Sequence, residues 1–426
     1  MREDLLHYIW KNGKIPLSNL YTSRRKSLQI ISLGIHNHDA GPDFLHAKLE
    51  IDGQLWVGNV EIHVKASDWY AHQHNTDTNY DNVILHVVWE ADTVVYRKNK
   101  EEIPALELIN CIPKVILNNY YKLFGTAKDN FINCEREVSL VAGFKFSFWL
   151  ERLYFERLEE KSNEINSLLA ETNNNWEKVL FLLLLKNFGL KLNGDAFLSL
   201  GRAMEFDIVR KLTHNVFQLE SLLFGLSGLL NNASSTDKFL IQMQSEYSFL
   251  RNKYNIRENS VQCPSFFRLR PVNFPTIRLS QLANLYGRQP QLFGKIITIK
   301  EVDHFYEIFS ISAGTYWRTH YVFGKLSPKR ENRLTRSFIN LLLINTILPI
   351  IFCYSKWQGI DVSAKIISIL QKLKKEDNKI TRKFQNLGVS CSNAMNSQAL
   401  LQLYNAYCTK NRCMECVVGD SLLKGK

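Results

Sequence analysis

The chain has 426 residues, a length that corresponds to about two to four ordinary domains. Hydrophobic residues make up 45% and charged residues 22% of the sequence, which excludes a disordered or collagen-like chain. The net charge of +12 is unevenly placed, because residues 1–110 carry 11 Lys/Arg and 15 Asp/Glu together with eight of the eleven histidines. An acidic, His-rich beginning and a basic remainder indicate metal chemistry coupled to an anionic partner.

The N-terminal part alternates short elements of both kinds. Apolar residues on one side predict a helix over 2–11, and Asp52-Gly53 predicts a tight hairpin turn. Strands are predicted over 27–35, 44–51, 55–65 and 83–89. This order is typical of an α+β domain, which we place at residues 1–125.

From about residue 144 the apolar pattern becomes helical. It predicts helices over 144–170, 175–190, 194–211, 215–231, 234–251, 297–311, 328–352, 360–377 and 394–407. Four prolines predict a loop-rich basic insert over 256–290. The sequence thus predicts an α+β protein, in which a large, mainly helical region over 140–426 follows the small N-terminal domain and ends in a cysteine cluster.

Targeting and membrane signals are weak. The first residues contain no apolar run of signal-peptide length. The most apolar stretch, 338–353, contains Asn340, Asn345 and Pro349 and is shorter than the roughly 20 residues of a spanning helix. We therefore expect a buried helix there and a cytoplasmic protein without membrane association, and the sequence leaves the oligomeric state open.

The densest chemistry lies around the predicted hairpin. Side chains alternate along a strand, so Glu61, His63 and Lys65 share one side, and Asp43 precedes the neighbouring strand at the end where they converge. Two carboxylates so placed predict a Mg²⁺ or Mn²⁺ site, with the carbonyl of Ile62 as a third ligand. An adjacent Lys or His would orient or deprotonate the attacking water.

These residues resemble the active-site signature of the PD-(D/E)XK nuclease superfamily. Pro42-Asp43, a hairpin and then Glu61-x-His63 follow its pattern, and the predicted element order matches its core of a helix, three strands, a helix and a strand. The resemblance implies a restriction-endonuclease-like domain, with Asp43 and Glu61 as metal ligands and His63 and Lys65 completing the catalytic set. His63 stands where the signature has Lys, and Lys65 lies two residues later on the same side.

Three segments are also similar to an uncharacterised bacterial family, domain of unknown function 2851. They are the region from Gly41 to Asp92, FFRLRPVNFPTIRLSQLANL and SQALLQLYNAYCTKNRCMECVVG. The similarity implies no activity.

Further histidines have spacings that suit a transition metal. His36-x-His38 and His72-x-His74 flank the predicted hairpin, so that a second metal or a role in ordering the substrate is open, as is an ordinary solvated loop. His86, inside an apolar strand, is predicted to be a buried, hydrogen-bonded residue.

Aromatic and basic residues interleave in the predicted insert. Arg268 and Arg270 follow Phe266 and Phe267, and Arg278 follows shortly after. Guanidinium groups bind phosphates and aromatic rings stack on bases, so these arginines are candidates for binding nucleic acid. Ordinary surface arginines over inward-facing phenylalanines are the alternative.

The sharpest local spacing is Cys408-x4-Cys413-x2-Cys416. Thiolates so spaced bind Zn²⁺ or an iron–sulfur cluster, and Arg412 would favour the ionised sulfurs. A fourth ligand is needed, for which Cys391 or Cys353 is the candidate. Some nucleases of the resembled superfamily carry such a cluster, while reduced buried thiols remain the alternative.

These features predict a metal-dependent phosphodiesterase that acts on nucleic acid. Two alternatives stay open: a non-catalytic nucleic-acid-binding protein on a degenerate nuclease fold, and a transition-metal hydrolase of a small phosphorylated substrate.

Overall fold

The chain forms two compact units in a computed structural model that describes residues 1–125, 130–141, 143–231, 236–256 and 261–425. The first unit contains residues 1–149, 382–389 and 401–426, and the second contains residues 150–381 and 390–400. The fold is mixed α+β, with a sheet in the N-terminal part and a large helical region after it, as predicted. The predicted division at 125–140 differs from the observed one, because residues 401–426 belong to the first unit.

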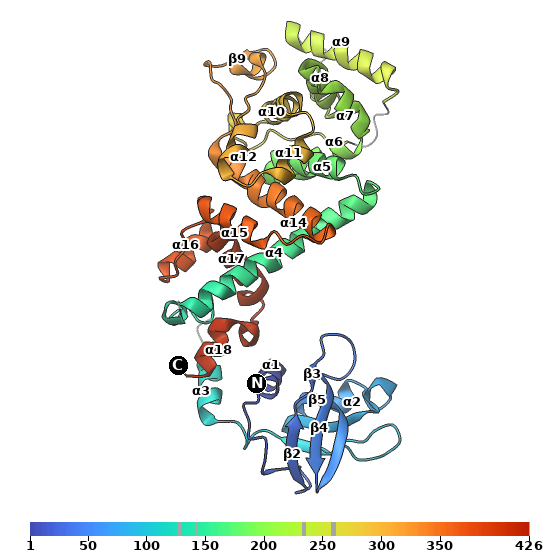
Figure 1. Ribbon diagram of the computed structural model, residues 1–426, viewed down its shortest axis with the longest axis vertical. Coiled ribbons are helices and arrows are strands. Elements are labelled where there is room, and N and C mark those ends of the chain that lie inside the picture. The colour runs from blue at the N-terminus through green and yellow to red at the C-terminus, as the bar shows by residue number, and fades with distance from the viewer. Residues whose placement is uncertain (126–129, 142, 232–235, 257–260, 426) are drawn as a thin grey trace. The chain divides into compact units, whose positions relative to one another are not determined.

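The first unit begins with the sheet and its short helices (Figure 1). Its elements up to residue 124 are α1 (Glu3–Lys11), β1 (Leu20–Tyr21), β2 (Ser27–Ser32), β3 (Ile35–His36), β4 (Phe44–Ile51), β5 (Gln54–Lys65), α2 (Asp68–Ala71), η1 (Thr78–Tyr80), β6 (Val83–Glu90), β7 (Ala105–Glu107) and α3 (Lys114–Phe124). The helix, the hairpin and the strand over 83–89 lie where the sequence predicts them. The elements β1, α2, η1, β7 and α3 were not predicted, and the predicted strand over 27–35 is divided into β2 and β3.

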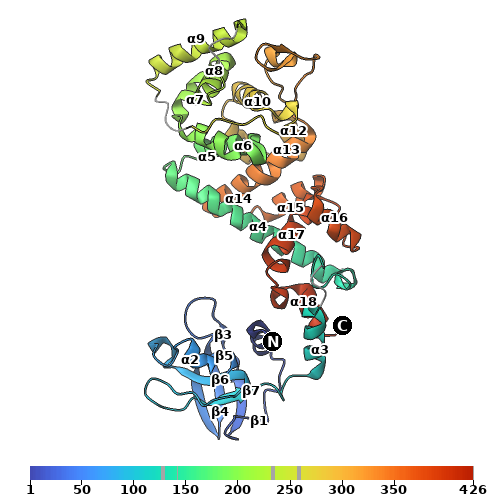
Figure 2. The ribbon, with the colours of Figure 1, turned by 180° about the vertical axis from the view of Figure 1, so that it is seen from behind.

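The sheet has the strand order β1-β2-β4-β5-β6-β7, and β3 pairs with β4. Strands β2, β4 and β5 are antiparallel neighbours, whereas β5, β6 and β7 run parallel. The β4–β5 turn consists of Asp52 and Gly53, whose φ angles of 50° and 76° suit the tight hairpin turns that favour glycine. Figure 2 shows this sheet from behind.

Alternation along β5 separates an apolar face from a polar one. Val60 and Ile62 are fully buried and belong to the same core as Leu5 and Ile9 of α1. Glu61 and His63, on the other face, are 4% and 1% exposed. The opposite face therefore buries polar side chains, which requires that they be satisfied by hydrogen bonds or a ligand.

The remaining elements of the first unit come mostly from the chain's end. They are η2 (Val138–Val141), the start of α4 (Phe144–Glu171), most of α16 (Lys379–Asn386), η6 (Leu403–Cys408), η7 (Cys413–Glu415) and α18 (Val417–Leu423). The Tyr8 hydroxyl of α1 donates to Asp420 Oδ1 of α18 at 2.8 Å, and Asn119 of α3 donates to the Leu423 carbonyl at 3.3 Å. These bonds join the last segment to both N-terminal helices.

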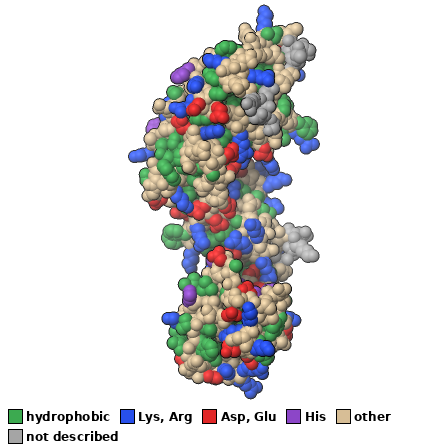
Figure 3. All heavy atoms as spheres, turned by 90° about the vertical axis from the view of Figure 1, so that its right-hand side faces the viewer, with side chains coloured by type: hydrophobic (Ala, Val, Ile, Leu, Met, Phe, Trp, Pro, Cys, Tyr) green, Lys and Arg blue, Asp and Glu red, His purple; other side chains and the backbone are tan. Residues whose placement is uncertain are grey.

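The second unit is almost entirely helical. Besides the rest of α4 it contains α5 (Trp176–Phe188), α6 (Leu190–Arg202), α7 (Phe206–Leu212), α8 (Val216–Leu226), α9 (Lys238–Lys253), η3 (Pro271–Asn273), α10 (Pro275–Arg288), α11 (Leu292–Thr298), α12 (Val302–Ile308), η4 (Thr315–Arg318), β8 (His320–Val322), β9 (Lys325–Leu326), α13 (Arg336–Leu342), η5 (Leu343–Ile347), α14 (Leu348–Trp357), α15 (Ser363–Lys372) and α17 (Ala394–Gln402). On the face in Figure 3, basic and acidic side chains are interspersed.

The predicted insert over 256–290 is wrong in its second half. Residues 275–288 form helix α10, and Pro275 is its first residue. A proline at that position has no N–H to lose and a φ angle suited to a helix, so it starts α10 rather than breaking it. Residues 257–260 of the predicted insert and residues 234–235 of a predicted helix lie outside the described residues.

The apolar segment Arg336–Trp357 is long and apolar enough to cross a membrane by length and composition. Within the described residues it is the single such helix, and 67% of its most apolar window is buried inside the chain. Burial of this kind is typical of a core helix, so the segment adds little in favour of a membrane span.

A buried acid lies in the second unit. Glu220 of α8 is 4% exposed and accepts hydrogen bonds from the Trp317 indole and from Ser280. Burial raises the pKa of Glu220 from 4.5 to about 7, although both hydrogen bonds lower it. The folded protein therefore holds its proton to a higher pH than the unfolded chain does.

This pKa predicts a pH dependence of stability. The stabilising contribution of protonated Glu220 is complete below about pH 4.5 and is lost as the pH rises through about 7. We expect Glu220→Gln to remove this dependence and to raise the free energy of unfolding at pH 8 by up to about 3 kcal/mol. Urea unfolding at pH 5 and pH 8 measures both effects, and an unchanged difference between the two pH values would contradict the assignment.

Candidate metal centre

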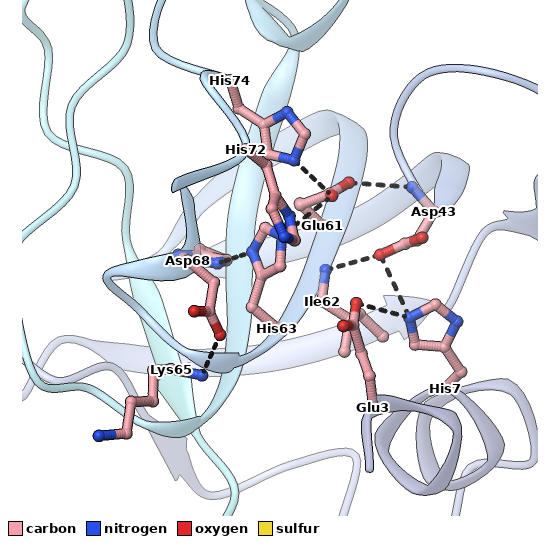
Figure 4. A network of polar contacts seen from close by, with 11 residues as sticks. Glu3, His7, Asp43, Glu61, Ile62, His63, Lys65, Asp68, His72 and His74 are labelled. Carbon is pink, nitrogen blue, oxygen red and sulfur yellow. Dashed lines mark hydrogen bonds and ion pairs between the residues drawn. The ribbon is translucent and has the colours of Figure 1, made fainter. Parts of the chain in front are cut away.

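Two carboxylates lie close together at the end of the β4–β5 hairpin, where each accepts a backbone N–H. The Asp43 N–H donates to Glu61 Oε2 at 3.1 Å, and the Ile62 N–H donates to Asp43 Oδ2 at 2.9 Å. Phe44 at the start of β4 pairs with Val60 in the middle of β5. This pairing places Asp43 and Glu61, the neighbouring residues in the chain, close together. Figure 4 shows the two carboxylates side by side.

Imidazoles surround Glu61 on the side of the α2 loop. His74 Nε2 lies 3.3 Å and His63 Nε2 lies 3.6 Å from Glu61 Oε1. His63 Nε2 also lies 3.0 Å from His72 Nδ1, while its Nδ1 lies 2.8 Å from His86 Nε2. One ring nitrogen of His63 therefore contacts the buried His86, and the other points toward Glu61 and His72.

A second group contacts Asp43 from the helix α1. His7 Nε2 lies 3.4 Å from Asp43 Oδ2 and 3.5 Å from Glu3 Oε1. Glu3 and His7 are one helical turn apart, so both side chains reach the same face of α1. In Figure 4 this group and the histidines of the α2 loop lie on opposite sides of the Asp43–Glu61 pair.

Burial and neighbouring charges shift several pKa values. Burial and the Asp43 charge raise the pKa of Glu61 to about 7 against the lowering effect of His74. Burial, reinforced by the neighbouring histidines, lowers the pKa of His63 to about 3, and burial lowers that of His86 to about 3. Burial also lowers the pKa of His7, but hydrogen bonds to Asp43 and Glu3 outweigh it and raise the value to about 10. At neutral pH His63 is neutral, the state required of a metal ligand, and His7 is cationic.

Two groups of three side chains bring their ligand atoms within 4.8 Å of one another among the described residues. One is His63, His72 and His74, and the other is Glu3, His7 and Asp43. Mg²⁺ prefers an all-oxygen octahedral site, whereas imidazoles and carboxylates together suit Mn²⁺, Fe²⁺ or Zn²⁺. The donor set therefore fits a transition metal better than Mg²⁺.

The chain matches a family described as protein of unknown function (DUF2851) over residues 3–379. It belongs to this family. Residues 380–426 of this DUF2851 member, which include the last of the three similar segments, lie outside the match. No curated protein and no solved structure matches the chain.

The remaining residues predicted near the hairpin have different positions in the DUF2851 protein. Lys65 is exposed, and in Figure 4 its side chain points away from Glu61, so it is not part of the group. The backbone N–H of Lys65 instead donates to Asp68 Oδ2 at 3.0 Å. The His36 ring lies 5.8 Å from that of His7 and 4.3 Å from that of His38, which places the pair on the Asp43 side.

The three predicted phosphate-binding arginines all lie in the second unit. Arg268 and Arg270 are exposed, and the Arg268 guanidinium lies 4.9 Å from the centre of the Phe267 ring. The prediction for Arg278 is wrong. This side chain is 7% exposed, lies 3.6 Å over the Phe338 ring and donates to Gln281 at 2.9 Å, so it is a core residue of α10.

The C-terminal cysteines have a different fourth neighbour from the predicted one. Cys408, Cys413 and Cys416 line one cavity together with Cys134. The predicted partner Cys391 belongs to the second unit, where Lys375 is its charged neighbour. Its alternative, Cys353, donates to Asn166 in that unit.

Sequence reasoning missed His7 and Glu3 as parts of the site. Their signal was an acid and a histidine four residues apart on a predicted helix, a spacing that on its own is common. Tyr80, whose ring stacks on His74 at 3.8 Å, was also missed, because it lies in the polar segment after β5.

Proposed function

We propose that this protein is a metal-dependent phosphodiesterase that acts on nucleic acid, with its metal at the end of the β4–β5 hairpin. The observation that carries the proposal is the close placement of the Asp43 and Glu61 carboxylates, which accept the backbone N–H groups of Ile62 and Asp43 respectively, with imidazoles contacting both carboxylates. Glu61 and His63 are buried in this cluster, and the pKa values of Glu61, His63 and His7 are shifted, which is typical of a site with a chemical role.

The order of the elements supports the choice of phosphodiester chemistry. Apart from the short elements β1, β3 and η1, the order is helix α1, strands β2, β4 and β5, the four-residue helix α2 and strand β6. This is the order of the core of the PD-(D/E)XK nucleases, which this part of the chain resembles. Asp43 and Glu61 occupy the signature's two acidic positions, and the buried His63 occupies that of its lysine.

The residues of the proposed site differ in their roles, and some of them would bind the metal. Glu61 and the imidazoles of His63, His72 and His74 would hold the metal together with Asp43, whose ligand atom also groups with those of Glu3 and His7. Mn²⁺, Fe²⁺ or Zn²⁺ fits these donors. When bound, such a metal polarises a phosphoryl oxygen and lowers the pKa of a coordinated water.

Neighbouring residues hold these groups in place. His86 fixes the orientation of the His63 ring through the bond to Nδ1, as an outer partner does for a metal-ligating histidine. Cationic His7 holds the Asp43 carboxylate, while the bond from Ile62 fixes its direction.

The charge distribution supports a nucleic acid as the partner. Residues 111–426 carry a net charge of +16, and Arg268 and Arg270 remain exposed. Phosphate backbones are bound chiefly by such basic side chains, in a manner that weakens with salt.

A second candidate is a transition-metal hydrolase of a small phosphorylated substrate. The grouping of His63, His72 and His74 favours it, because three histidine nitrogens within 4.8 Å of one another are a ligand set also used by such enzymes.

The test is cleavage of labelled single- and double-stranded DNA and RNA by the full chain in Mg²⁺, Mn²⁺ or Zn²⁺, with a chelator as control. We expect Mn²⁺-dependent cleavage that the chelator abolishes. Salt-sensitive binding without cleavage in any metal would contradict the proposal and favour a degenerate binding protein. Bound metal without cleavage or nucleic-acid binding would favour the small-substrate hydrolase.

A further inference from the structure

Four cysteines from separate segments of the first unit meet at one cavity. Cys134 follows α3, Cys408 ends η6, Cys413 begins η7 and Cys416 immediately precedes α18. The cavity has a volume of about 20 Å³. We call this set the four-cysteine pocket.

Arg412 lines the four-cysteine pocket together with the thiols. Arg412, expected to favour ionised sulfurs, directs its guanidinium to Glu415. Burial and then the proximity of the other sulfurs raise the pKa values of Cys134 and Cys408, and burial raises that of Cys413 to about 11. Thiols that line one cavity become good ligands once a metal displaces their protons.

The spacing of the sulfurs discriminates between a single ion and a cluster. A Zn–S length of about 2.3 Å in a tetrahedral site puts the sulfurs about 3.8 Å apart. Among the described side chains, however, the groups with all ligand atoms within 4.8 Å of one another contain no cysteine. Four sulfurs that face one cavity at a wider spacing suit a ligand with several metal atoms, and cysteine thiolates hold iron–sulfur clusters in this number.

Hydrogen bonds to the sulfurs also fit a cluster in this pocket. The Asn133 amide donates to Cys413 Sγ at 3.5 Å, and the backbone N–H groups of Val418 and Gly419 donate to Cys416. Hydrogen bonds to the sulfurs are among the groups that tune such a cluster.

We propose that the four-cysteine pocket binds an iron–sulfur cluster that fastens residues 401–426 to the rest of the first unit. The site is independent of the proposed phosphodiesterase activity, and three of its ligands lie outside the part of the chain that matches the family. Its structural effect would reach α1, because the segment between these ligands and the C-terminus contacts Tyr8 through Asp420.

The test is metal analysis of the full chain purified without oxygen. We expect iron and acid-labile sulfide in equal amounts, with the visible absorption of an iron–sulfur cluster. Zinc in place of iron would overturn the cluster, and absence of any metal after reconstitution with iron and sulfide would overturn the site. Both results come from the unmodified protein and need no variant.

Cysteine variants test the ligand set. Cys134→Ser should lose most of the iron, whereas Cys391→Ser, which removes a buried cysteine of the other unit, should retain it. Retention of full iron and sulfide by Cys134→Ser would contradict the assignment of the fourth ligand.

A glycine variant tests the pocket with all four cysteines present. A Cβ at Gly419 would lie 1.9 Å from the carbonyl oxygen of Cys413, so Gly419→Ala must push α18 away from η7. We expect it to lose most of the iron, while the control Gly294→Ala, which has nothing within 4 Å of its added Cβ, keeps it. Equal iron content in both variants would contradict the placement of Cys413 and Cys416 in one site.

Discussion

Replacement of Glu61 by Gln should reduce metal-dependent cleavage by about 10³-fold, because Glu61 would hold the metal that activates the reacting water. The variant removes the negative charge but keeps an oxygen that can accept the Asp43 N–H bond. The fold of the hairpin should therefore survive, and the loss should appear in kcat. The measurement is the initial rate of oligonucleotide cleavage in Mn²⁺.

Glu50→Gln is the matched control for this variant. Glu50 lies on β4 of the same hairpin, paired with Leu55 near the turn and away from Asp43. The Glu50→Gln variant should cleave at the rate of the unmodified protein. Equal rates for Glu61→Gln and Glu50→Gln would remove Glu61 from the chemistry.

A second large effect is expected on metal binding. The double variant His72→Ala/His74→Ala removes two of the three imidazoles that converge beside Glu61, and should weaken Mn²⁺ or Zn²⁺ binding by about 100-fold or more. His72 is exposed and His74 is half-buried, so their truncation should disturb the core little. Calorimetric titration of the metal-free chain measures the affinity.

The control here is His46→Ala, which removes an exposed histidine of β4. The metal affinity of the His46→Ala variant should equal that of the unmodified protein. An unchanged affinity in the double variant would mean that these histidines form an ordinary hydrogen-bonded cluster.

The sequence was sufficient to predict the hairpin and the two acidic residues at its end. Alternation over 44–51 and 55–65 with Asp52-Gly53 between them predicts the hairpin. Its register shifts between Phe44 and Ala47, which the sequence did not predict, and Asp43 lies beside Glu61 in the shifted pairing. Local patterns also predicted α1 and β6, and the burial of His86 follows from its place in an apolar strand.

Contacts between distant segments could not be predicted in this way. Cys134 stands alone in the sequence, and nothing near it indicates that it meets Cys408, Cys413 and Cys416. The spacing of the three C-terminal cysteines predicts three ligands from the sequence alone. The fourth depends on how α3 and α18 pack.

Arg278 was mispredicted for a related reason. Pro275 was taken as a helix breaker, whereas it is the first residue of α10, which carries Arg278 into the core against Phe338. Aromatic and basic residues do interleave in this segment, but the helix determines which of their side chains are exposed.

The most direct test of the proposed metal centre is anomalous diffraction from crystals of the full chain soaked in Mn²⁺, measured at the manganese absorption edge. The proposal predicts a peak within bonding distance of Glu61 and His63, at about 2.0–2.2 Å from the ligand atoms as in comparable metal sites. A manganese-soaked crystal with no peak beside Glu61 and His63 would contradict it.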